Sequence, residues 1–300
     1  MILYGVVVHG GAGSPSQFSD GCKAACEIAF KLLEAGKRSL DAVVEAVRVL
    51  EDDGRFNAGS GSVLRLDGKT IEMDASVMDS KGNIGIVIAI KNIKNPILVA
   101  QAVMETPHIA LAGEGAAAFA KKQGFEPFHQ VSQHSLERYH AVKKLIKEGK
   151  LDKEAPRWKG HDIKSLWNFD DVPYKEVFCD TIGAVAIDKE GVLSTANSTG
   201  GFSPMMLGRV GDTPMIGCGF YAAPACAVST TGIGEEIIKK MLAKTVHDMV
   251  SHGEDISIAC KKGINMFPFK TKMGIIAISK AGYAIESNTD MAYYALVKER

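Results

Sequence analysis

Residues 179–188 read CDTIGAVAID, and this stretch decides how the rest of the chain is interpreted. From Ile182 onward it has the small and β-branched residues of a buried β-strand. An Asp-Thr pair stands directly before that strand, and residues 150–178 ahead of the pair show neither a strand pattern nor a core-helix pattern. A strand in the middle of the chain therefore begins beside Thr181, as though the chain started there.

The segment 150–178 carries many charges, two prolines and no sustained hydrophobic period. Connections of this length are uncommon inside compact domains. Its composition leaves two interpretations open. The segment is either a solvated surface loop or a dispensable linker between two halves of the chain.

The composition is that of an ordinary globular protein with a sizeable core. The chain has 300 residues, of which 46% are hydrophobic and 23% are charged. Lys and Arg together number 35, as do Asp and Glu, so no net field attracts nucleic acid or an anionic membrane surface. We therefore expect a small-molecule substrate or a protein partner, with no nucleic acid and no membrane.

The N-terminal sequence MILYGVVVHGGAG has no basic region ahead of its apolar run, and that run is only as long as a strand. No stretch of the sequence reaches the ~18 apolar residues of a membrane span. The six cysteines form no CxxC pair and have no histidine at zinc spacing. These features predict a cytoplasmic protein with reduced thiols and no catalytic metal.

Hydrophobic periodicity predicts an α/β sandwich, with strands in runs and helices between the runs. Ser39 is expected to be the N-cap of the second helix, and a polar, glycine-rich loop fills 199–219. The predicted strands are 2–9, 62–67, 69–78, 84–90, 181–187, 192–197, 225–230, 273–279, 282–287 and 291–297, and the predicted helices are 17–35, 39–52, 95–105, 113–123, 134–149, 232–250 and 254–265.

Two glycine-rich stretches in the first half could form binding loops. The stretch VVVHGGAGS at 6–14 runs from a strand into a turn, but it matches neither GxGxxG nor GxxxxGK[ST], so a tight turn without a ligand is favoured over a phosphate site. The stretch FNAGSGSVL at 56–64 surrounds Asn57 with small residues that permit close approach of the backbone. A plain turn is the alternative.

The loop NSTGGFSPMMLGRVGDTP at 197–214 places Arg209 and Asp212 three positions apart, framed by glycines. A guanidinium can bind a carboxylate at two points, and a carboxylate can bind an ammonium. Together the two side chains would recognise the head of a free α-amino acid. A local ion pair between Arg209 and Asp212 is the alternative.

In VSTTGIGEEIIKK at 228–240, a strand is predicted to end at Thr230-Thr231-Gly232 and a helix to begin, with two glutamates at its positive end. Free backbone N–H groups at such a helix start can face a developing oxyanion, although ordinary capping explains the pattern too. The chain has no GxSxG elbow and no HExxH motif, and its eight histidines are scattered. A histidine-based triad is therefore not indicated.

Taken together, these stretches resemble the threonine-type asparaginases and isoaspartyl peptidases, a family of N-terminal-nucleophile (Ntn) hydrolases. Each motif is weak alone, but their order along nearly the whole chain is specific. The motifs are HGGAG at 9–13, FNAGSGSVL at 56–64, MDASVMD at 73–79, DTIGAVAID at 180–188, NSTGG at 197–201, GRVGDTP at 208–214 and STTGIGE at 229–235.

In this family the precursor cleaves itself just before a threonine that matches Thr181, so the resemblance implies cleavage between Asp180 and Thr181. The products would be an alpha subunit, residues 1–180 with the linker, and a beta subunit, residues 181–300, of one domain. A threonine hydroxyl needs a base, and a freed α-amine titrates near ~7.7–8.0, which suits a general base at neutral pH. Cleavage would thus create the nucleophile and its base on one residue.

The resemblance implies further catalytic roles. Thr199 would hydrogen-bond to Thr181 and orient it, and Thr231 with Gly232 would supply the oxyanion hole. Thr181 would attack the side-chain carbonyl of asparagine, or the β-linked carbonyl of an isoaspartyl dipeptide. Ammonia or an amino acid would leave, and water would release aspartate from the acyl-enzyme.

The resemblance also implies how substrate and subunits are held. Arg209 would bind the substrate's α-carboxylate and Asp212 its α-ammonium, and Asn57 would belong to a supporting loop near the scissile bond. Relatives adopt a four-layer αββα sandwich, pair as a dimer of αβ heterodimers and use no cofactor. They often hold a structural sodium ion through backbone carbonyls, here near Phe56–Gly61.

Asp180 departs from the asparaginase branch, where many members have glycine before the threonine. The order Asp-Thr-Ile-Gly is closer to the glycosylasparaginases, which cleave the sugar–asparagine linkage. HGGAG, FNAG and Gly201 favour the asparaginase branch over this alternative. Two other classes stay open: a nucleotide-binding protein built on the GGAGS turn, and a non-catalytic binding protein of the same fold.

Overall fold

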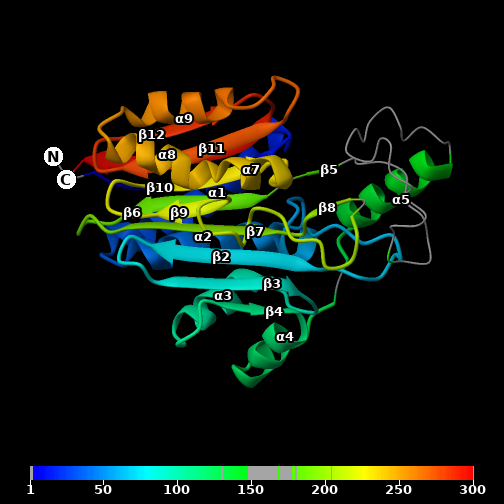
Figure 1. Ribbon diagram of the computed structural model, residues 1–300. Coiled ribbons are helices and arrows are strands. Elements are labelled where there is room, and N and C mark those ends of the chain that lie inside the picture. Colours follow the sequence, from blue (N-terminus) through cyan, green and yellow to red (C-terminus); the bar gives the residue numbers. More distant parts are fainter. Residues whose placement is uncertain are drawn as a thin grey trace.

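The computed structural model describes residues 3–129, 131–147, 168, 178–179, 181–203 and 205–299. The protein is a mixed α/β structure in which two sheets pack on each other and helices cover their outer faces (Figure 1). Strands β1 (Leu3–Ala12) and β13 (Met291–Glu299) are neighbours, so the two ends of the described chain lie side by side. Most of the predicted linker 150–178 lies outside the described residues.

The larger sheet is formed, in spatial order, by β13, β1, β6 (Ile182–Ile187), β7 (Leu193–Thr199), β2 (Met73–Asp79), β3 (Ile84–Ile90) and β4 (Ala110–Ala112). Its pairs are antiparallel except for β3 with β4. Strand β6 lies between β1 and β7, where Gly183 faces His9 on one side and Asn197 on the other. The strand that begins beside Thr181 is therefore hydrogen-bonded to a neighbouring strand on each of its two edges.

The smaller sheet is formed, in spatial order, by β12 (Tyr283–Ser287), β11 (Met273–Ser279), β10 (Cys226–Gly232) and β9 (Phe220–Ala222). Strands β10 and β11 lie against β1 and β6 of the larger sheet. Val7, Val185 and Ile276 are fully buried between the two sheets. A separate two-stranded sheet pairs β5 (Phe178–Cys179) with β8 (Phe202–Ser203).

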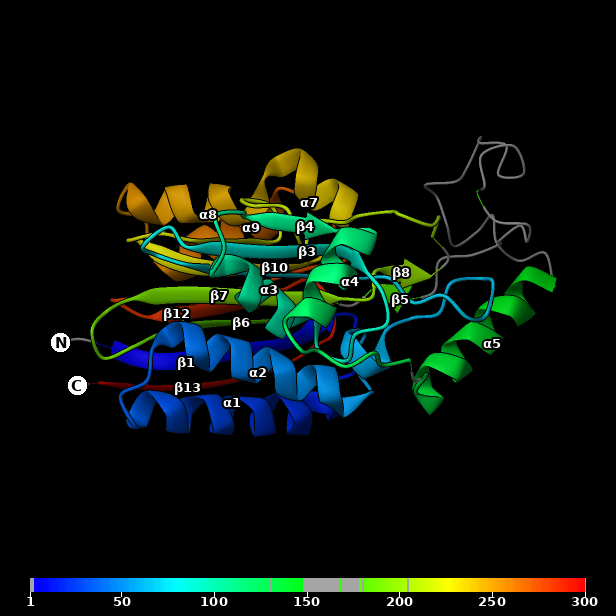
Figure 2. The same ribbon diagram turned by 90° about the horizontal axis from the view of Figure 1, so that it is seen from below.

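Helices cover the outer faces. Helices α1 and α2 lie side by side along the larger sheet (Figure 2), and α8 and α9 pack on the smaller sheet. The helices described are α1 (Ser19–Glu34), α2 (Ser39–Asp53), α3 (Pro96–Met104), α4 (Gly113–Lys122), α5 (Gln133–Lys147), α7 (Gly234–Lys240), α8 (Leu242–Ser251) and α9 (Ile256–Asn265), with short 3-10 turns at Ser16–Phe18 and Gly59–Gly61.

Most predicted elements are confirmed within a few residues, but the predicted cap of α2 is wrong. Ser39 is the first helical residue, and Arg38 occupies the N-cap position without a side-chain capping bond. The hydroxyl of Ser39 instead shares a hydrogen bond of 2.9 Å with that of Ser194 on β7. A contact between distant segments has displaced the local capping role.

The predicted strand 62–67 is also wrong, because this segment is a buried turn. The amide of Arg65 donates to the carbonyl of Thr70 at 2.9 Å, and the carboxylate of Asp67 accepts from the amide and the hydroxyl of Thr70. The side chains around Val63 and Arg65 alternate in polarity, which is typical of a half-buried strand. The turn instead buries Arg65 together with its apolar neighbours.

The predicted helix 232–250 is broken into α7 and α8. Met241 lies between them with φ of +46°, which a continuous right-handed helix excludes. Two strands of three residues, β4 and β9, were not predicted, since three residues carry too little periodicity to be recognised.

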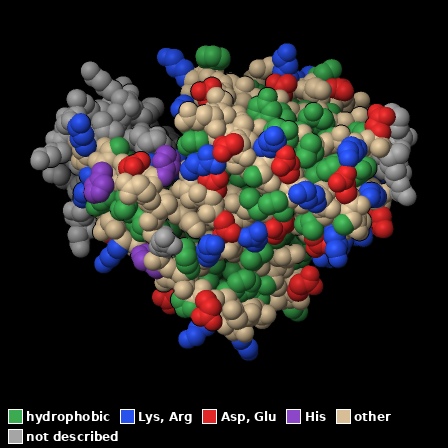
Figure 3. Space-filling view, turned by 180° about the vertical axis from the view of Figure 1, so that it is seen from behind, with side chains coloured by type: hydrophobic (Ala, Val, Ile, Leu, Met, Phe, Trp, Pro, Cys, Tyr) green, Lys and Arg blue, Asp and Glu red, His purple; other side chains and the backbone are tan. Residues whose placement is uncertain are grey.

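Acidic and basic side chains are intermingled on the face shown in Figure 3, in keeping with the balanced composition. No helix within the described residues is long and apolar enough to cross a membrane. Five cysteines are free and buried, as expected for reduced thiols: Cys22, Cys26, Cys218, Cys226 and Cys260.

Candidate active site

Thr181 lies at the start of the central strand β6 and is 6% exposed. Its Oγ1 is 3.3 Å from Oγ1 of Thr213, and either hydroxyl can donate. Just before it, β5 is held by backbone pairing to β8. Asp180, on the other side of the predicted cleavage site, lies outside the described residues.

A buried polar cluster supports the start of β6. Nε2 of His9 and Oγ of Ser229 are 2.8 Å apart, and a Cβ added at Gly183 would lie 2.2 Å from that hydroxyl and 2.5 Å from that ring nitrogen. Glycine is therefore required at 183, because a side chain would separate β6 from the groups below it. Burial lowers the pKa of His9 to about 3, and the backbone carbonyl of Thr181 only partly offsets this. A neutral, engaged imidazole of this kind serves the core, as expected for a lone histidine.

Thr199 and Gly232 line the same small cavity as Thr181. Oγ1 of Thr199, at the end of β7, accepts a hydrogen bond of 3.0 Å from the amide of Gly201. Gly232 has φ of +142°, and a Cβ there would lie 2.4 Å from the carbonyl oxygen of Lys272, so only glycine fits. The end of β7 in the larger sheet and the end of β10 in the smaller sheet thus meet the start of β6.

Thr231 precedes Gly232 at the end of β10 and is fully buried. Its Oγ1 accepts a hydrogen bond of 3.0 Å from the amide of Ala12, within the HGGAG stretch. This stretch belongs to β1, which extends to Ala12 rather than ending at residue 9. The glycine-rich turn therefore supports Thr231.

Arg209 and Asp212 converge on one point. A Cβ added at Gly234 would lie 2.8 Å from Oδ1 of Asp212 and 2.9 Å from Nη2 of Arg209. The alternative of a local ion pair is not what the structure has: Arg209 pairs with Glu235 at 2.8 Å and stacks 4.2 Å over the ring of Phe202. The two side chains therefore approach Gly234 so closely that a Cβ there would clash with both, and both line the cavity of Thr181.

Burial raises the pKa of Asp212 to about 7, and the nearby charge of Arg209 offsets part of this increase. The hydroxyl of Thr230 donates to Oδ2 of Asp212 at 3.5 Å. Asp212 can thus change its charge near neutral pH. A carboxylate held in this way gains most from a cation placed beside it.

Asn57 ties the FNAG loop to the NSTGG turn. Its Nδ2 donates to the carbonyl of Gly201, its Oδ1 accepts from the amide of Val63 at 3.0 Å, and its carbonyl accepts from the amide of Gly200 at 2.8 Å. The side chain is fully buried. Asn57 therefore holds the two loops together.

Thr213 is a residue of this site to which the sequence analysis assigned no role. It lines the cavity, contacts Thr181 through its hydroxyl, and its carbonyl accepts 2.7 Å from the hydroxyl of Ser76 on β2. The signal was its position directly after Asp212 in GRVGDTP. Its role could not be deduced, because Thr213 and Thr181 are far apart in the chain.

The cavity at Thr181 has a volume of about 10 Å³, enough for about one water molecule. A larger cavity of about 530 Å³ lies beyond Glu72 and Lys91 and contains none of the predicted site residues. Chemistry rather than size identifies the site, since the nucleophile candidate and the charged pair line the smaller cavity. Within the described residues, no group of three or more His, Cys, Asp or Glu is placed to hold a metal.

Comparison with known proteins gives a consistent result. Residues 2–300 match the family described as Asparaginase. A plant-type L-asparaginase of Pyrococcus horikoshii is 40% identical over 99% of this chain and 97% of its own length. One of Thermococcus kodakarensis is 41% identical over 98% and 96%, respectively. An isoaspartyl peptidase/L-asparaginase of Xenopus laevis is 39% identical over 98% of this chain and 92% of its own length.

The raised pKa of Asp212 predicts a pH-dependent effect on stability. The folded state keeps its proton up to about pH 7, whereas the unfolded chain releases it near the ordinary value of 3.8, so stability falls as pH rises between the two values. Asp212→Asn removes the free-energy cost of ionising a buried carboxylate. Thermal unfolding should show a higher midpoint for the variant at pH 8 and a smaller gain at pH 5. A larger gain at pH 5 would contradict the assignment.

Proposed function

The chain belongs to the asparaginase family, and from this premise we propose that it hydrolyses the side-chain amide of L-asparagine and the β-aspartyl bond of isoaspartyl dipeptides. The observation that carries the proposal is the convergence of Arg209 and Asp212 at Gly234, beside the cavity of Thr181. One positive and one negative group at a single point suit the carboxylate and ammonium of an α-amino acid. Both substrates carry this head one methylene from the reacting carbonyl.

Thr181 is proposed as the nucleophile, released by self-cleavage after Asp180. In the uncut chain its nitrogen belongs to a peptide bond and is not basic, while its hydroxyl contacts Thr213. His9 offers no effective base, because its Nε2 is engaged with Ser229 and burial lowers its pKa to about 3, which disfavours uptake of a proton. Cleavage would free an α-amine with a pKa near ~7.7–8.0, which can take the hydroxyl proton during attack.

Thr231 and Gly232 are proposed to stabilise the oxyanion. Because Oγ1 of Thr231 accepts from the amide of Ala12, its own hydrogen is left to donate, and the next residue, Gly232, lines the cavity. The carbonyl carbon then bonds to Oγ1 of Thr181, and its oxygen carries the developing charge. Ammonia leaves with the proton held by the α-amine, and water hydrolyses the ester to release aspartate and restore the hydroxyl.

Substrate binding would change the partner of Arg209. Its guanidinium pairs with Glu235, which is 38% exposed. A substrate carboxylate can replace or share this pair, while the α-ammonium supplies the cation that favours ionised Asp212. Thr199, which lines the same cavity, is proposed to orient Thr181.

The four-layer αββα sandwich of the Ntn hydrolases is the proposed fold, supported by the contact between the two sheets and by the helices outside them. Residues 1–180 and 181–300 would be its alpha and beta subunits after cleavage. Because β1 of the first segment lies between β13 and β6 of the second, and β7 pairs with β2, the larger sheet holds both segments together and the fragments should stay associated. We also propose a dimer of αβ heterodimers, which sedimentation of the cleaved protein can disprove.

A structural sodium ion near Phe56–Gly61 is also proposed. The carbonyls of Phe56, Ala58 and Gly59 each accept one backbone amide, which leaves a second lone pair for a hard cation. These neutral oxygens fit a monovalent ion better than a divalent one. A higher unfolding midpoint in sodium chloride than in choline chloride is the expected result, and equal midpoints would count against the ion.

Activity assays test the proposal directly. The wild-type protein should release ammonia from L-asparagine, and Thr181→Ala should reduce kcat by roughly 10⁴-fold or more. Arg209→Met should raise KM by roughly 10–100-fold, because it removes a charge-assisted hydrogen bond. Isoaspartyl dipeptides and glycosylated asparagine, compared as substrates, separate the proposed activity from that of a glycosylasparaginase. Wild-type protein that turns over none of them would support a non-catalytic binding protein instead.

The pH profile provides an independent prediction. Asp212 must be ionised to hold the substrate's ammonium and has a pKa of about 7, while the α-amine of Thr181 must be unprotonated. The value of kcat/KM for L-asparagine should therefore fall below neutral pH as both Asp212 and the α-amine take up a proton. For succinamate, which lacks the α-ammonium, the value of kcat/KM should depend only on protonation of the α-amine of Thr181. Identical profiles for the two substrates would rule out this role of Asp212.

A further inference from the structure

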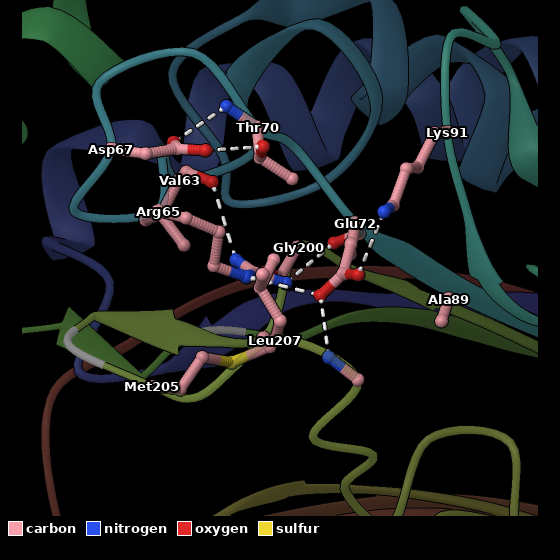
Figure 4. A network of polar contacts seen from close by, with 12 residues as sticks. Val63, Arg65, Asp67, Thr70, Glu72, Ala89, Lys91, Gly200, Met205 and Leu207 are labelled. Atoms are coloured by element: carbon pink, nitrogen blue, oxygen red, sulfur yellow. Dashed lines mark hydrogen bonds and ion pairs between the residues drawn. The ribbon is translucent and has the colours of Figure 1, made fainter. Parts of the chain in front are cut away.

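Glu72 is a buried carboxylate outside the cavity of Thr181 that binds two of the loops forming the site (Figure 4). It stands directly before β2. Its Oε2 accepts a hydrogen bond of 2.9 Å from the amide of Gly208 and lies 3.5 Å from Nε of Arg65, while its Oε1 lies 3.2 Å from Nζ of Lys91. One carboxylate therefore joins three segments of the chain.

Arg65 extends this connection to the turn after Thr199. Its guanidinium is fully buried and donates 3.0 Å to the carbonyl of Gly200 through Nη1 and 3.0 Å to the backbone carbonyl of Glu72 through Nη2. A buried guanidinium requires a counter-charge, which Glu72 provides. Loss of Glu72 would thus disturb Gly200 as well as Gly208.

The bond to Gly208 acts on the backbone that carries Arg209. Gly208 adopts φ of +75° and is the residue directly before Arg209, so its amide fixes the direction from which the guanidinium reaches Gly234 and Phe202. The opposite edge of Glu72 faces Lys91, whose side chain is 48% exposed and lines the larger cavity rather than that of Thr181. The two edges of the same carboxylate can therefore be tested separately.

We propose that Glu72 is a positioning residue for amide hydrolysis: through Gly208 it holds Arg209 where the α-carboxylate binds, and through Arg65 it holds the turn that follows Thr199. This inference rests on the proposed function, because it takes Arg209 as the carboxylate-binding group. Glu72 itself touches no reacting atom. Its effect should appear in KM for substrates that carry an α-carboxylate.

Glu72→Asp is the principal test. It keeps the charge beside Arg65 but withdraws the carboxylate from the amide of Gly208 by one methylene. In fully cleaved enzyme, KM for L-asparagine should rise about tenfold, with kcat nearly unchanged. The value of kcat/KM for β-alaninamide, which is asparagine without its α-carboxylate, should stay near that of the wild type. Lys91→Gln is the matched control, since it removes the exposed partner of the same carboxylate, and its KM should equal that of the wild type.

The double variant Arg65→Met with Glu72→Met separates positioning from folding. Replacing a buried ion pair by apolar side chains of similar volume commonly preserves stability, yet it removes both anchors. Its unfolding midpoint should match the wild type, while KM rises and kcat falls. An unchanged KM in both Glu72 variants, or an equal loss with L-asparagine and β-alaninamide, would overturn the positioning role alone. Wild-type enzyme that releases no ammonia would overturn the proposed function, and this inference with it.

Discussion

The hydrogen bonding of β6 along both of its edges is the constraint on which the site depends. Because β6 is bonded to β1 on one edge and to β7 on the other, the residue at its start is held at a fixed point of the larger sheet. Thr181 occupies that point. The ends of β7 and β10 then bring Thr199 and Gly232 to the same cavity, so the catalytic candidates are carried by strands rather than by loops alone.

This arrangement also explains why the proposed chemistry needs no histidine. The polar groups beneath β6 are already committed: His9 is bonded to Ser229, and Thr231 accepts from Ala12. They hold the strand and the proposed oxyanion donors in place, and they leave Thr181 without a base in the uncut chain. A new α-amine is the simplest base that can arise at that position without disturbing the network.

The charged part of the site is held differently, by loops with buried anchors. Arg209 pairs with Glu235 and lies close to Gly234, and Asp212 is buried with a pKa of about 7. Such groups are costly to bury without a partner, and an α-amino acid head supplies both partners at once. Recognition and catalysis thus meet in one cavity but rely on separate supports.

The sequence predicted the elements with clear periodicity, and the motif order predicted which residues would meet. It failed where distant contacts decide local structure. Ser39 bonds to Ser194 instead of capping α2. The segment around the buried Arg65 has a strand-like pattern of side chains although it forms a turn. Thr213 lies within the GRVGDTP motif, which by itself gave it no role, and Glu72 lies just before the MDASVMD motif. Their roles come from contacts with Thr181 and Gly208, which only the folded chain brings together.

The most direct test of the central claim is the intact mass of the purified protein after incubation at neutral pH, beside Thr181→Ala. The account predicts two fragments from the wild type, one beginning at Thr181, and a variant that stays whole. A wild-type chain that remains uncut yet hydrolyses L-asparagine would contradict it, because Thr181 would then lack the α-amine on which the proposed mechanism depends.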